Sequence, residues 1–230
     1  MEGGRDSVPV PSMARESKSF GMAHAPNPDL EAGPDGKPRC RWATSAPEYV
    51  AYHDAEWGRP VRDDRGLYER LCLEAFQSGL SWLTILRKRE AFRAAFAGFE
   101  IERVARFGPR DRKRLLADAG IVRNRAKIDA AIANARAATE LHAGGESLAE
   151  LIWSFAPERR SAPLSFAEVP SKTAESAALA RKLKGRGFCF VGPTTAYALM
   201  QACGLVNDHL AGCAFRDAVE LERSASSGTP

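Results

Sequence analysis

The sequence has 230 residues, of which 44% are hydrophobic and 27% charged, and its formal net charge at pH 7 is +4. This length is enough for one or two domains with a buried core, so a disulfide-stapled miniprotein and a mostly disordered chain are both excluded. No run approaches about 18 consecutive apolar residues, which argues against a membrane-spanning protein and a membrane partner. Residues 1–11 lack the apolar segment of a signal peptide, so we expect a cytoplasmic protein whose five cysteines are thiols or metal ligands.

The two ends of the chain differ in composition from its middle. Residues 1–38 are rich in Gly and Pro and hold few large apolar residues, which predicts a disordered N-terminal arm. Residues 217–230 finish in small and polar residues and are predicted to form a flexible C-terminal tail. Residues 39–216 are rich in Ala, whereas Val, Ile and Thr together number only 23 in the chain. We therefore expect one all-α domain between the two ends.

Helix boundaries within this domain follow from local patterns. Capping boxes over residues 45–48 and 147–150 predict two helix starts. Three stretches repeat apolar residues on one helical face: Leu67, Leu71, Ala75 and Ser78; Ile128, Ile132, Ala135 and Thr139; and Leu179 with Leu183. Helix ends are predicted at Gly120, Gly144, Gly145, Gly185 and Gly204. These signals together indicate about eight helices joined by short loops.

Positive charge is concentrated in two stretches. Residues 87–127 hold 13 Lys or Arg against 5 Asp or Glu, and residues 181–186 hold four basic residues and no acid. Such clusters favour a polyanion, because each neutralised phosphate releases condensed counterions. The alternative is a set of solvated helix faces, which charge runs often are.

Residues 181–203 join a basic helix to an apolar one through a glycine-bounded turn, the pattern of a helix-hairpin-helix. Gly187 and Gly192 allow tight backbone geometry, and Pro193 suits a first helical turn. Exposed N–H groups at such a helix start, near Thr194, can bind a phosphate without reading bases. The alternative is an ordinary helix pair with a glycine cap.

Cys40 and His53 lie 13 residues apart, and His209 and Cys213 lie one helical turn apart. These four residues form a possible Cys₂His₂ set, and a closed tetrahedral set is typical of structural zinc. Spacing alone leaves open that they are separately packed residues, because the two pairs are far apart in the sequence.

Residues 42–82 combine aromatic side chains with one carboxylate in an apolar run. Glu74 lies among Leu, Cys, Ala and Phe, so it either faces away from the core or has a functional role. Aromatic walls with one acceptor carboxylate suit a flat cationic ring, through stacking and cation–π attraction. The alternative is a set of core aromatics. The aromatic residues concerned are Trp42, Tyr52, Trp57 and Trp82.

These motifs, in this order, resemble the DNA-3-methyladenine glycosylase I family of bacterial alkylation-repair enzymes. The resemblance covers about residues 39–215. The segments that carry it are Cys40 to Trp42, Tyr49 to Gly58, Leu71 to Trp82, Asp118 to Ile121, Phe188 to Thr194 and Met200 to His209. The long N-terminal arm departs from the usual family start.

The resemblance implies a helix-hairpin-helix DNA glycosylase of base-excision repair. Such an enzyme hydrolyses the N-glycosidic bond of 3-methyladenine in alkylated double-stranded DNA and leaves an abasic site. The family's structural zinc ion would be held by Cys40, His53, His209 and Cys213. No nucleotide cofactor is implied, and a monomer is expected. The turn at 188–192 is apolar and offers no lysine nucleophile, so a monofunctional hydrolase without lyase activity is expected.

The resemblance also places the base pocket. Glu74 and Tyr52 would be catalytic, and Trp82, Trp57 and Trp42 would bind the base. A base methylated at N3 is cationic and leaves easily, so stacking and one acceptor would select it with little acid catalysis.

Base extrusion and the hairpin pattern suggest which residues contact DNA. Leu80, in a Gly-Leu-Ser turn between two helices, is the candidate for filling the gap left by the extruded base, unless it is an interior residue. Gly187, Gly192 and Thr194 would bind the DNA backbone. Asp208 precedes a zinc ligand and is expected to support the metal site rather than act as a base.

Two other functions remain open from the sequence. The first is a non-enzymatic, zinc-stabilised helix-hairpin-helix DNA-binding protein, in which Glu74 only caps or pairs. The second is a related glycosylase that prefers another lesion, such as 3-methylguanine.

Overall fold

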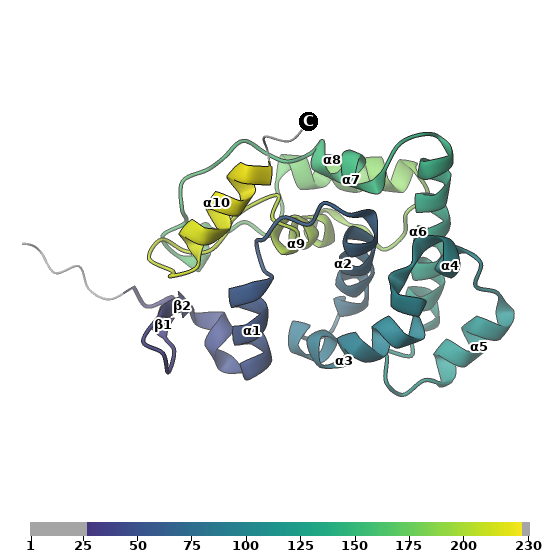
Figure 1. Cartoon of the computed structure of the whole chain (residues 1–230), viewed down its shortest axis with the longest axis horizontal. Helices are drawn as coiled ribbons and strands as arrows, with labels where there is room; N and C mark the ends of the chain where they lie inside the picture. Colours follow the sequence, from purple (N-terminus) through teal and green to yellow (C-terminus); the bar gives the residue numbers. More distant parts are fainter. Residues whose placement is uncertain (1–26, 227–230) are drawn as a thin grey trace, which may run out of the picture.

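The computed structural model describes residues 27–226, and these residues are mostly helical, as predicted (Figure 1). They form a two-stranded sheet, three 3₁₀ helices and ten α-helices. In chain order these are β1 (Leu30–Ala32), β2 (Pro38–Cys40), η1 (Arg41–Ser45), α1 (Pro47–Ala55), α2 (Asp64–Gln77), α3 (Trp82–Ala95), η2 (Ala97–Phe99), α4 (Ile101–Ala105), α5 (Pro109–Ala117), α6 (Arg125–Ala143), α7 (Leu148–Trp153), η3 (Phe166–Glu168), α8 (Ala174–Gly185), α9 (Pro193–Ala202) and α10 (Arg216–Ser226).

The prediction of a disordered arm is wrong for residues 27–38. Strands β1 and β2 pair antiparallel, with Leu30 opposite Cys40. Gly36 supplies the positive φ of +74° in the turn between them. The buried Arg39 side chain binds the carboxylates of both Asp35 and Asp54, which ties the sheet to α1. The rest of the predicted arm, residues 1–26, lies outside the described residues.

The prediction of a flexible tail is also wrong for residues 217–226, which belong to α10. Val219 is fully buried, and Asn207 donates to Glu220 across the interface. The Arg223 guanidinium donates to the carbonyls of Gly204 and Leu205, which anchors this end of α10. Residues 227–230 lie outside the described part of the chain.

The predicted helix signals have mixed outcomes. The capping box at Ser147 is confirmed, with reciprocal bonds to Glu150. The helix start predicted at 45–48 is confirmed, because α1 begins with Pro47 in its first turn. The capping box there is wrong: Ser45 ends η1, its hydroxyl donates to the carbonyl of Trp42, and Ala46 precedes α1.

The predicted glycine stops also differ in detail. Gly145 and Gly204 have positive φ just after α6 and α9, as predicted. After α8 the left-handed residue is Gly187, because Gly185 is still helical. Gly120 lies three residues beyond the end of α5 and is not left-handed.

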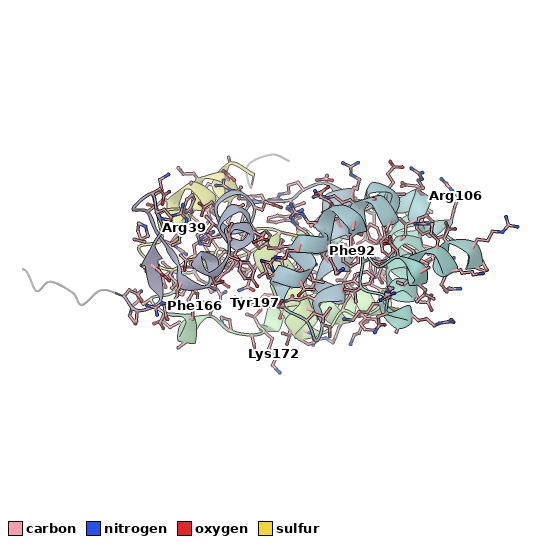
Figure 2. All side chains as sticks on the ribbon, turned by 90° about the horizontal axis from the view of Figure 1, so that it is seen from below. Arg39, Phe92, Arg106, Phe166, Lys172 and Tyr197 are labelled. Atoms are coloured by element: carbon pink, nitrogen blue, oxygen red, sulfur yellow. The ribbon has the colours of Figure 1, made fainter. Side chains whose placement is uncertain are left out.

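Helix α2 lies at the centre of the fold and packs against α3, α6, α7 and α9 (Figure 1). Its Phe76 ring contacts Phe92 of α3, with ring centroids 4.6 Å apart. Figure 2 shows Arg39 and Arg106 near opposite ends of the long axis, with Tyr197 and Phe92 between them. Among the described residues, no helix is long and apolar enough to cross a membrane. This arrangement places the C-terminal turn of α2, which carries Glu74, in the middle of the molecule.

Candidate active site and metal centre

Four ligand atoms from opposite ends of the chain meet at one buried point. Cys40 ends β2 and His53 lies in α1, whereas His209 and Cys213 precede α10. Their ligand atoms all lie within 4.8 Å of one another, so the four residues could hold a metal ion. Cys213 Sγ lies 3.6 Å from His53 Nε2 and 3.4 Å from His209 Nδ1. A hydrogen bond from the Cys40 thiol, assisted by both imidazoles, holds the pKa of the Cys213 thiol well below its usual range.

Both imidazoles are oriented by bonds from the ring nitrogen that faces away from the cluster. His53 Nδ1 lies 2.8 Å from a carboxylate oxygen of Asp54, which Arg39 also binds. His209 Nε2 lies 3.1 Å from the carbonyl oxygen of Trp57. These partners require protons on the outer nitrogens, which leaves the lone pairs of His53 Nε2 and His209 Nδ1 directed at the cluster.

The expectation that Asp208 supports the metal site is wrong. Its carboxylate accepts hydrogen bonds from the Tyr197 hydroxyl at 2.6 Å and from Gln201 Nε2 at 2.9 Å. Both partners lie in α9, one helical turn apart. The carboxylate that contacts a ligand is that of Asp54, which lies 2.8 Å from His53 Nδ1.

A pocket of about 270 Å³ lies beside the cluster. The Tyr52 and Trp82 rings lie with centroids 5.4 Å apart and planes tilted by 55°. The Trp42 and Trp57 rings meet edge to face at 5.1 Å. All five residues predicted for base recognition line this one pocket: Trp42, Tyr52, Trp57, Glu74 and Trp82.

The pocket and the Cys/His cluster share a wall. The Trp57 ring contacts His209 at a centroid distance of 4.7 Å, and the Trp42 ring contacts His53 at 5.4 Å. Each tryptophan therefore lies between the cluster and the pocket. A change in the cluster would move the aromatic side of the pocket.

Glu74 is the buried acid of the pocket. The residue is only 7% exposed. Burial raises the pKa of the Glu74 carboxyl to about 8, against the opposing charge of Arg70. The pKa of the Tyr52 phenol is raised well above its usual value, mainly by burial and secondly by the negative charge of Glu74. The uncompensated burial of an acid in a cleft is typical of a functional site.

Sequence reasoning missed several residues of the pocket. Gln201 and Asp208 both lie in the segment Met200 to His209, which carries part of the family resemblance. The four-residue spacing of Tyr197 and Gln201 is a signal for a shared helix face. Phe166 comes from the connection between α7 and α8, where no pattern indicated it (Figure 2). The additional lining residues are Gln77, Phe166, Val169, Ala198, Gln201 and Asp208.

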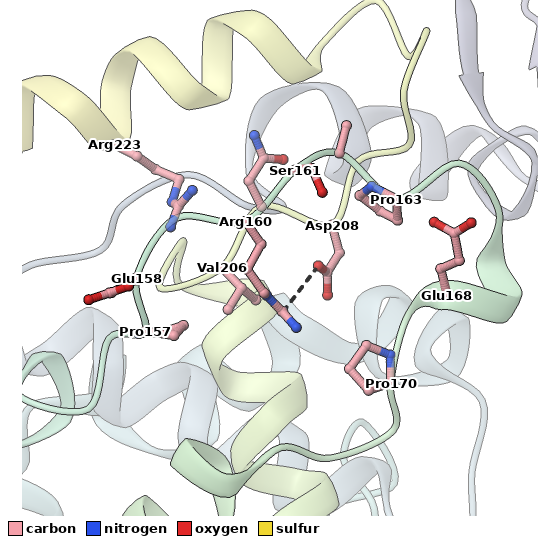
Figure 3. Close-up of a pocket in the computed structure, with 12 residues that line it drawn as sticks. Pro157, Glu158, Arg160, Ser161, Pro163, Glu168, Pro170, Val206, Asp208 and Arg223 are labelled. Atoms are coloured by element: carbon pink, nitrogen blue, oxygen red, sulfur yellow. Dashed lines mark ion pairs between the residues drawn. The ribbon is translucent and has the colours of Figure 1, made fainter.

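A second cavity, of about 190 Å³, lies on the other side of Asp208 (Figure 3). Arg160 faces Asp208 across it, with 3.9 Å between the guanidinium nitrogen and the carboxylate oxygen. Asp208 lines both cavities and is only 6% exposed. It therefore forms part of the wall between them.

Leu80 lies in the turn between α2 and α3 and is 42% exposed, so it is not an interior residue. Gly79 gives this turn its positive φ of +79°. The buried Lys127 ammonium donates to the carbonyls of Phe76 and Ser78, at 2.9 and 2.5 Å. The turn is therefore fixed from α6, with Leu80 directed to its outside.

The turn between α8 and α9 is fixed from the same helix. Asn134 of α6 accepts from the Cys189 N–H at 2.7 Å and donates to its carbonyl at 3.2 Å. Gly187 has a φ of +87°, as a tight turn requires. Gly192 precedes α9 with an ordinary φ of −91°, so the prediction of special backbone geometry there is wrong. Thr194, in the first turn of α9, is exposed.

Much of the predicted basic excess at 87–127 is neutralised within the chain. Its internal ion pairs include Arg87 with Glu48, Arg89 with Glu56, Arg93 with Glu69, and Arg112 with Asp129. The second basic stretch differs, because Arg181, Lys182 and Lys184 are exposed on α8 beside the turn at 186–192. This stretch remains the stronger candidate for contact with a polyanion.

The fold and the site define a helical protein that can enclose one planar ring between aromatic side chains, beside a buried Cys/His cluster. The model of the methyladenine glycosylase family matches residues 42–217. The chain belongs to the methyladenine glycosylase family.

Sequence comparison with two known proteins supports this assignment. The chain is 49% identical to DNA-3-methyladenine glycosylase 1 of Escherichia coli (strain K12), over 76% of this chain and 95% of that protein. It is 43% identical to DNA-3-methyladenine glycosylase of Haemophilus influenzae, over 76% of this chain and 96% of that protein.

Solved structures show the same likeness. A crystal structure of 3-methyladenine DNA glycosylase I superposes with a TM-score of 0.74, at 49% identity, and covers 76% of this chain and 98% of that one. A structure of the Staphylococcus aureus enzyme, described as the structural basis of 3-methyladenine recognition, has a TM-score of 0.74 at 33% identity. It covers 77% of this chain and 96% of that chain.

Proposed function

We propose that this protein is a monofunctional DNA glycosylase that releases 3-methyladenine from alkylated double-stranded DNA. The observation that carries the proposal is the buried Glu74 carboxyl in a pocket walled by Tyr52, Trp57 and Trp82. Its family membership, and the activity named for its relatives, support the same conclusion.

The chemistry follows from the charge of the lesion. A 3-methyladenine base carries a positive charge in DNA, so the bond between the base and C1′ of the sugar is already weak. Aromatic faces attract the cationic ring, and the Glu74 carboxylate accepts hydrogen bonds from it. The C1′–N bond breaks with its electrons on the base, which leaves as a neutral molecule, and water adds to C1′ and releases one proton to the solvent. The products are a free base and an abasic site.

The Cys/His cluster suits one structural zinc ion. In a tetrahedral zinc site, with Zn–S about 2.3 Å and Zn–N about 2.0 Å, a sulfur and a nitrogen ligand lie about 3.5 Å apart. The distances from Cys213 Sγ to the imidazole nitrogens, 3.6 and 3.4 Å, fit that spacing. Two thiolates and two imidazoles, all buried, would complete the coordination. The ion would join β2 to the segment before α10 and hold Trp42 and Trp57 in place.

The α8–α9 pair would serve as a helix-hairpin-helix that binds one DNA strand. Gly192 and Thr194 would offer backbone N–H groups to a phosphate, beside the exposed Lys and Arg side chains of α8. The N–H of Gly187 donates to the Lys184 carbonyl, so Gly187 would contribute through the tight turn that lets the DNA backbone come close. Leu80 would occupy the space left by the extruded nucleotide. One chain supplies all of these groups, so we propose that a monomer acts.

The test is the release of free bases from methylated duplex DNA by the purified protein, resolved by chromatography. The proposal expects selective release of 3-methyladenine and an abasic site without strand cleavage. A folded protein that binds the DNA and releases no base would instead be a non-enzymatic DNA-binding protein. Release mainly of another methylated base would contradict the proposed substrate.

Replacement of Leu80 by Ala tests the extrusion step. We expect base release from a fully paired duplex to fall about tenfold, because the unfilled gap in the base stack loses about 1.4 kcal/mol of the stabilisation that offsets unstacking. Release from a single-stranded oligonucleotide with the same lesion should be unchanged, because no stack has to be broken there. An equal loss on both substrates would show that Leu80 does not assist extrusion.

A further inference from the structure

Four side chains that the proposed reaction does not use form a directional chain of hydrogen bonds at the pocket wall. The Arg160 guanidinium donates to the Tyr197 hydroxyl at 3.1 Å. Tyr197 must then donate its own proton to Asp208, at 2.6 Å. The second donor to the same Asp208 oxygen is the Gln201 amide, at 2.9 Å. Figure 3 shows Arg160 and Asp208 facing each other at this place.

This chain fixes the orientation of the Gln201 amide. An ionised carboxylate only accepts hydrogen bonds, so the NH₂ group of Gln201 has to face Asp208. The amide oxygen Oε1 is then held on the opposite side. Among the described residues, no group donates a hydrogen bond to Oε1. Gln201 lines the base pocket together with Glu74. Gln201 is therefore a pre-oriented acceptor in the same pocket as the Glu74 carboxyl.

A pocket with two fixed acceptors discriminates between the purines. Adenine carries an exocyclic amino group that donates hydrogen bonds, where guanine carries the acceptor O6. An acceptor opposite O6 would leave two buried lone pairs facing each other without a proton between them, which is costly. The same acceptor opposite an amino group, made more acidic by methylation of the ring, forms a good hydrogen bond.

We propose that Gln201, oriented by Asp208, is a specificity residue that selects methylated adenine over methylated guanine. Its Oε1 accepts from the exocyclic amino group of the base, and Asp208 prevents the amide from turning its NH₂ group toward guanine O6. The inference rests on the proposed glycosylase function and adds to it the basis of the choice between the two purines.

The test is the ratio of 3-methyladenine to 3-methylguanine released from the same methylated DNA. Gln201→Leu should lower this ratio about tenfold, mainly through slower release of 3-methyladenine. Asp208→Asn should lower it as well, because an Asn amide can donate to Gln201 Oε1 and allow the Gln201 amide to reverse. Tyr197→Phe is the matched control: it removes another donor to Asp208 but leaves the Asp208–Gln201 bond, so the ratio should stay at the wild-type value.

A purely structural role would slow the release of both bases equally and leave the ratio unchanged, and that result in both Gln201→Leu and Asp208→Asn would overturn the inference. A lowered ratio in Tyr197→Phe equal to that of Gln201→Leu would also overturn it, since the orienting bond would then not be the cause. If the wild-type protein releases neither base, the proposed function itself fails, which is a distinguishable outcome.

Discussion

Glu74→Gln should slow the release of 3-methyladenine about 10- to 100-fold while leaving the binding of undamaged DNA unchanged. The substitution keeps the size of the side chain but replaces a charged acceptor facing a cationic base with a neutral one. A hydrogen bond to a charged group contributes about 1.5–3 kcal/mol, which sets the expected range. The measurement is single-turnover release of base with the variant and the wild-type protein at equal concentration.

The raised pKa of Glu74 predicts that the rate of base release depends on pH. Burial raises the pKa of Glu74 to about 8, so below that pH the free protein holds this carboxyl largely protonated. The cationic base binds the ionised form, and kcat/KM should therefore rise with pH until about 8. Glu74→Gln should abolish this rise, because it removes the titrating group. A rise of the same size in the variant would assign the titration to another group.

Burial of Glu74 also affects stability, with a definite sign. The folded protein keeps a proton on this carboxyl up to about pH 8, whereas the unfolded chain loses it near the ordinary value of 4.5. The free energy of unfolding should therefore fall as pH rises through this interval, by up to about 1.4 kcal/mol for each pH unit. Glu74→Gln should be more stable than wild type at pH 8 and close to it at pH 5, as urea denaturation would measure. Equal stabilities at pH 8 would contradict the burial of an uncompensated acid.

Removal of the proposed zinc ion should have the largest effect on stability. Cys40→Ser, or treatment of the wild-type protein with a strong chelator, should lower the melting temperature by roughly 10 °C or more. Zinc binding to such sites contributes about 10 kcal/mol or more in small peptides, and here it would join segments about 170 residues apart in the sequence. Elemental analysis should find one zinc ion per chain in the wild-type protein.

Cys189→Ser is the matched control for this experiment. Cys189 is exposed and lies outside the cluster, so its replacement should change neither the zinc content nor the melting temperature. Melting temperatures that are the same with and without chelator, in protein shown to have lost its metal, would contradict the structural role of the ion.

The pocket could be predicted from the sequence because its chemistry depends on uncommon residue types in a recognisable order. Trp42, Trp57 and Trp82 are three of only four tryptophans, and Glu74 is an acid in an apolar run. The same holds for the four Cys and His residues of the cluster. The identity of these side chains carries most of the information, and the helical fold only has to bring them together.

The folded structure of residues 27–38 and 217–226 could not be predicted, because it depends on contacts with residues far away in the sequence. Strands β1 and β2 have three residues each, too few to show the alternation of apolar and polar residues that is typical of a strand. The ion pair of Arg39 with Asp54 helps to hold them in place. Helix α10 is mostly polar, and its docking depends on one buried Val219 and on hydrogen bonds from Arg223 to the carbonyls of Gly204 and Leu205.

The contacts of Asp208 could not be predicted from the sequence either. Its place before His209 in the sequence favoured a link to the metal site, whereas its side chain lies against α9 at the wall of the pocket. Neighbouring residues in a loop can point in opposite directions, so sequence proximity to a ligand does not fix what a side chain contacts. Only the three-dimensional arrangement identifies Tyr197 and Gln201 as its partners.

We propose that Glu74, in this aromatic pocket, makes the chain a 3-methyladenine glycosylase. The most direct measurement is chromatography of the bases released from methylated duplex DNA by metal-loaded wild-type protein and by Glu74→Gln, with folding and DNA binding checked for both. We predict that the wild type releases 3-methyladenine and that the variant, equally folded and equally bound, does so about 10- to 100-fold more slowly. Equal rates in the two proteins would contradict the role of Glu74, and no release by a folded wild-type protein that binds the DNA would contradict the proposed activity.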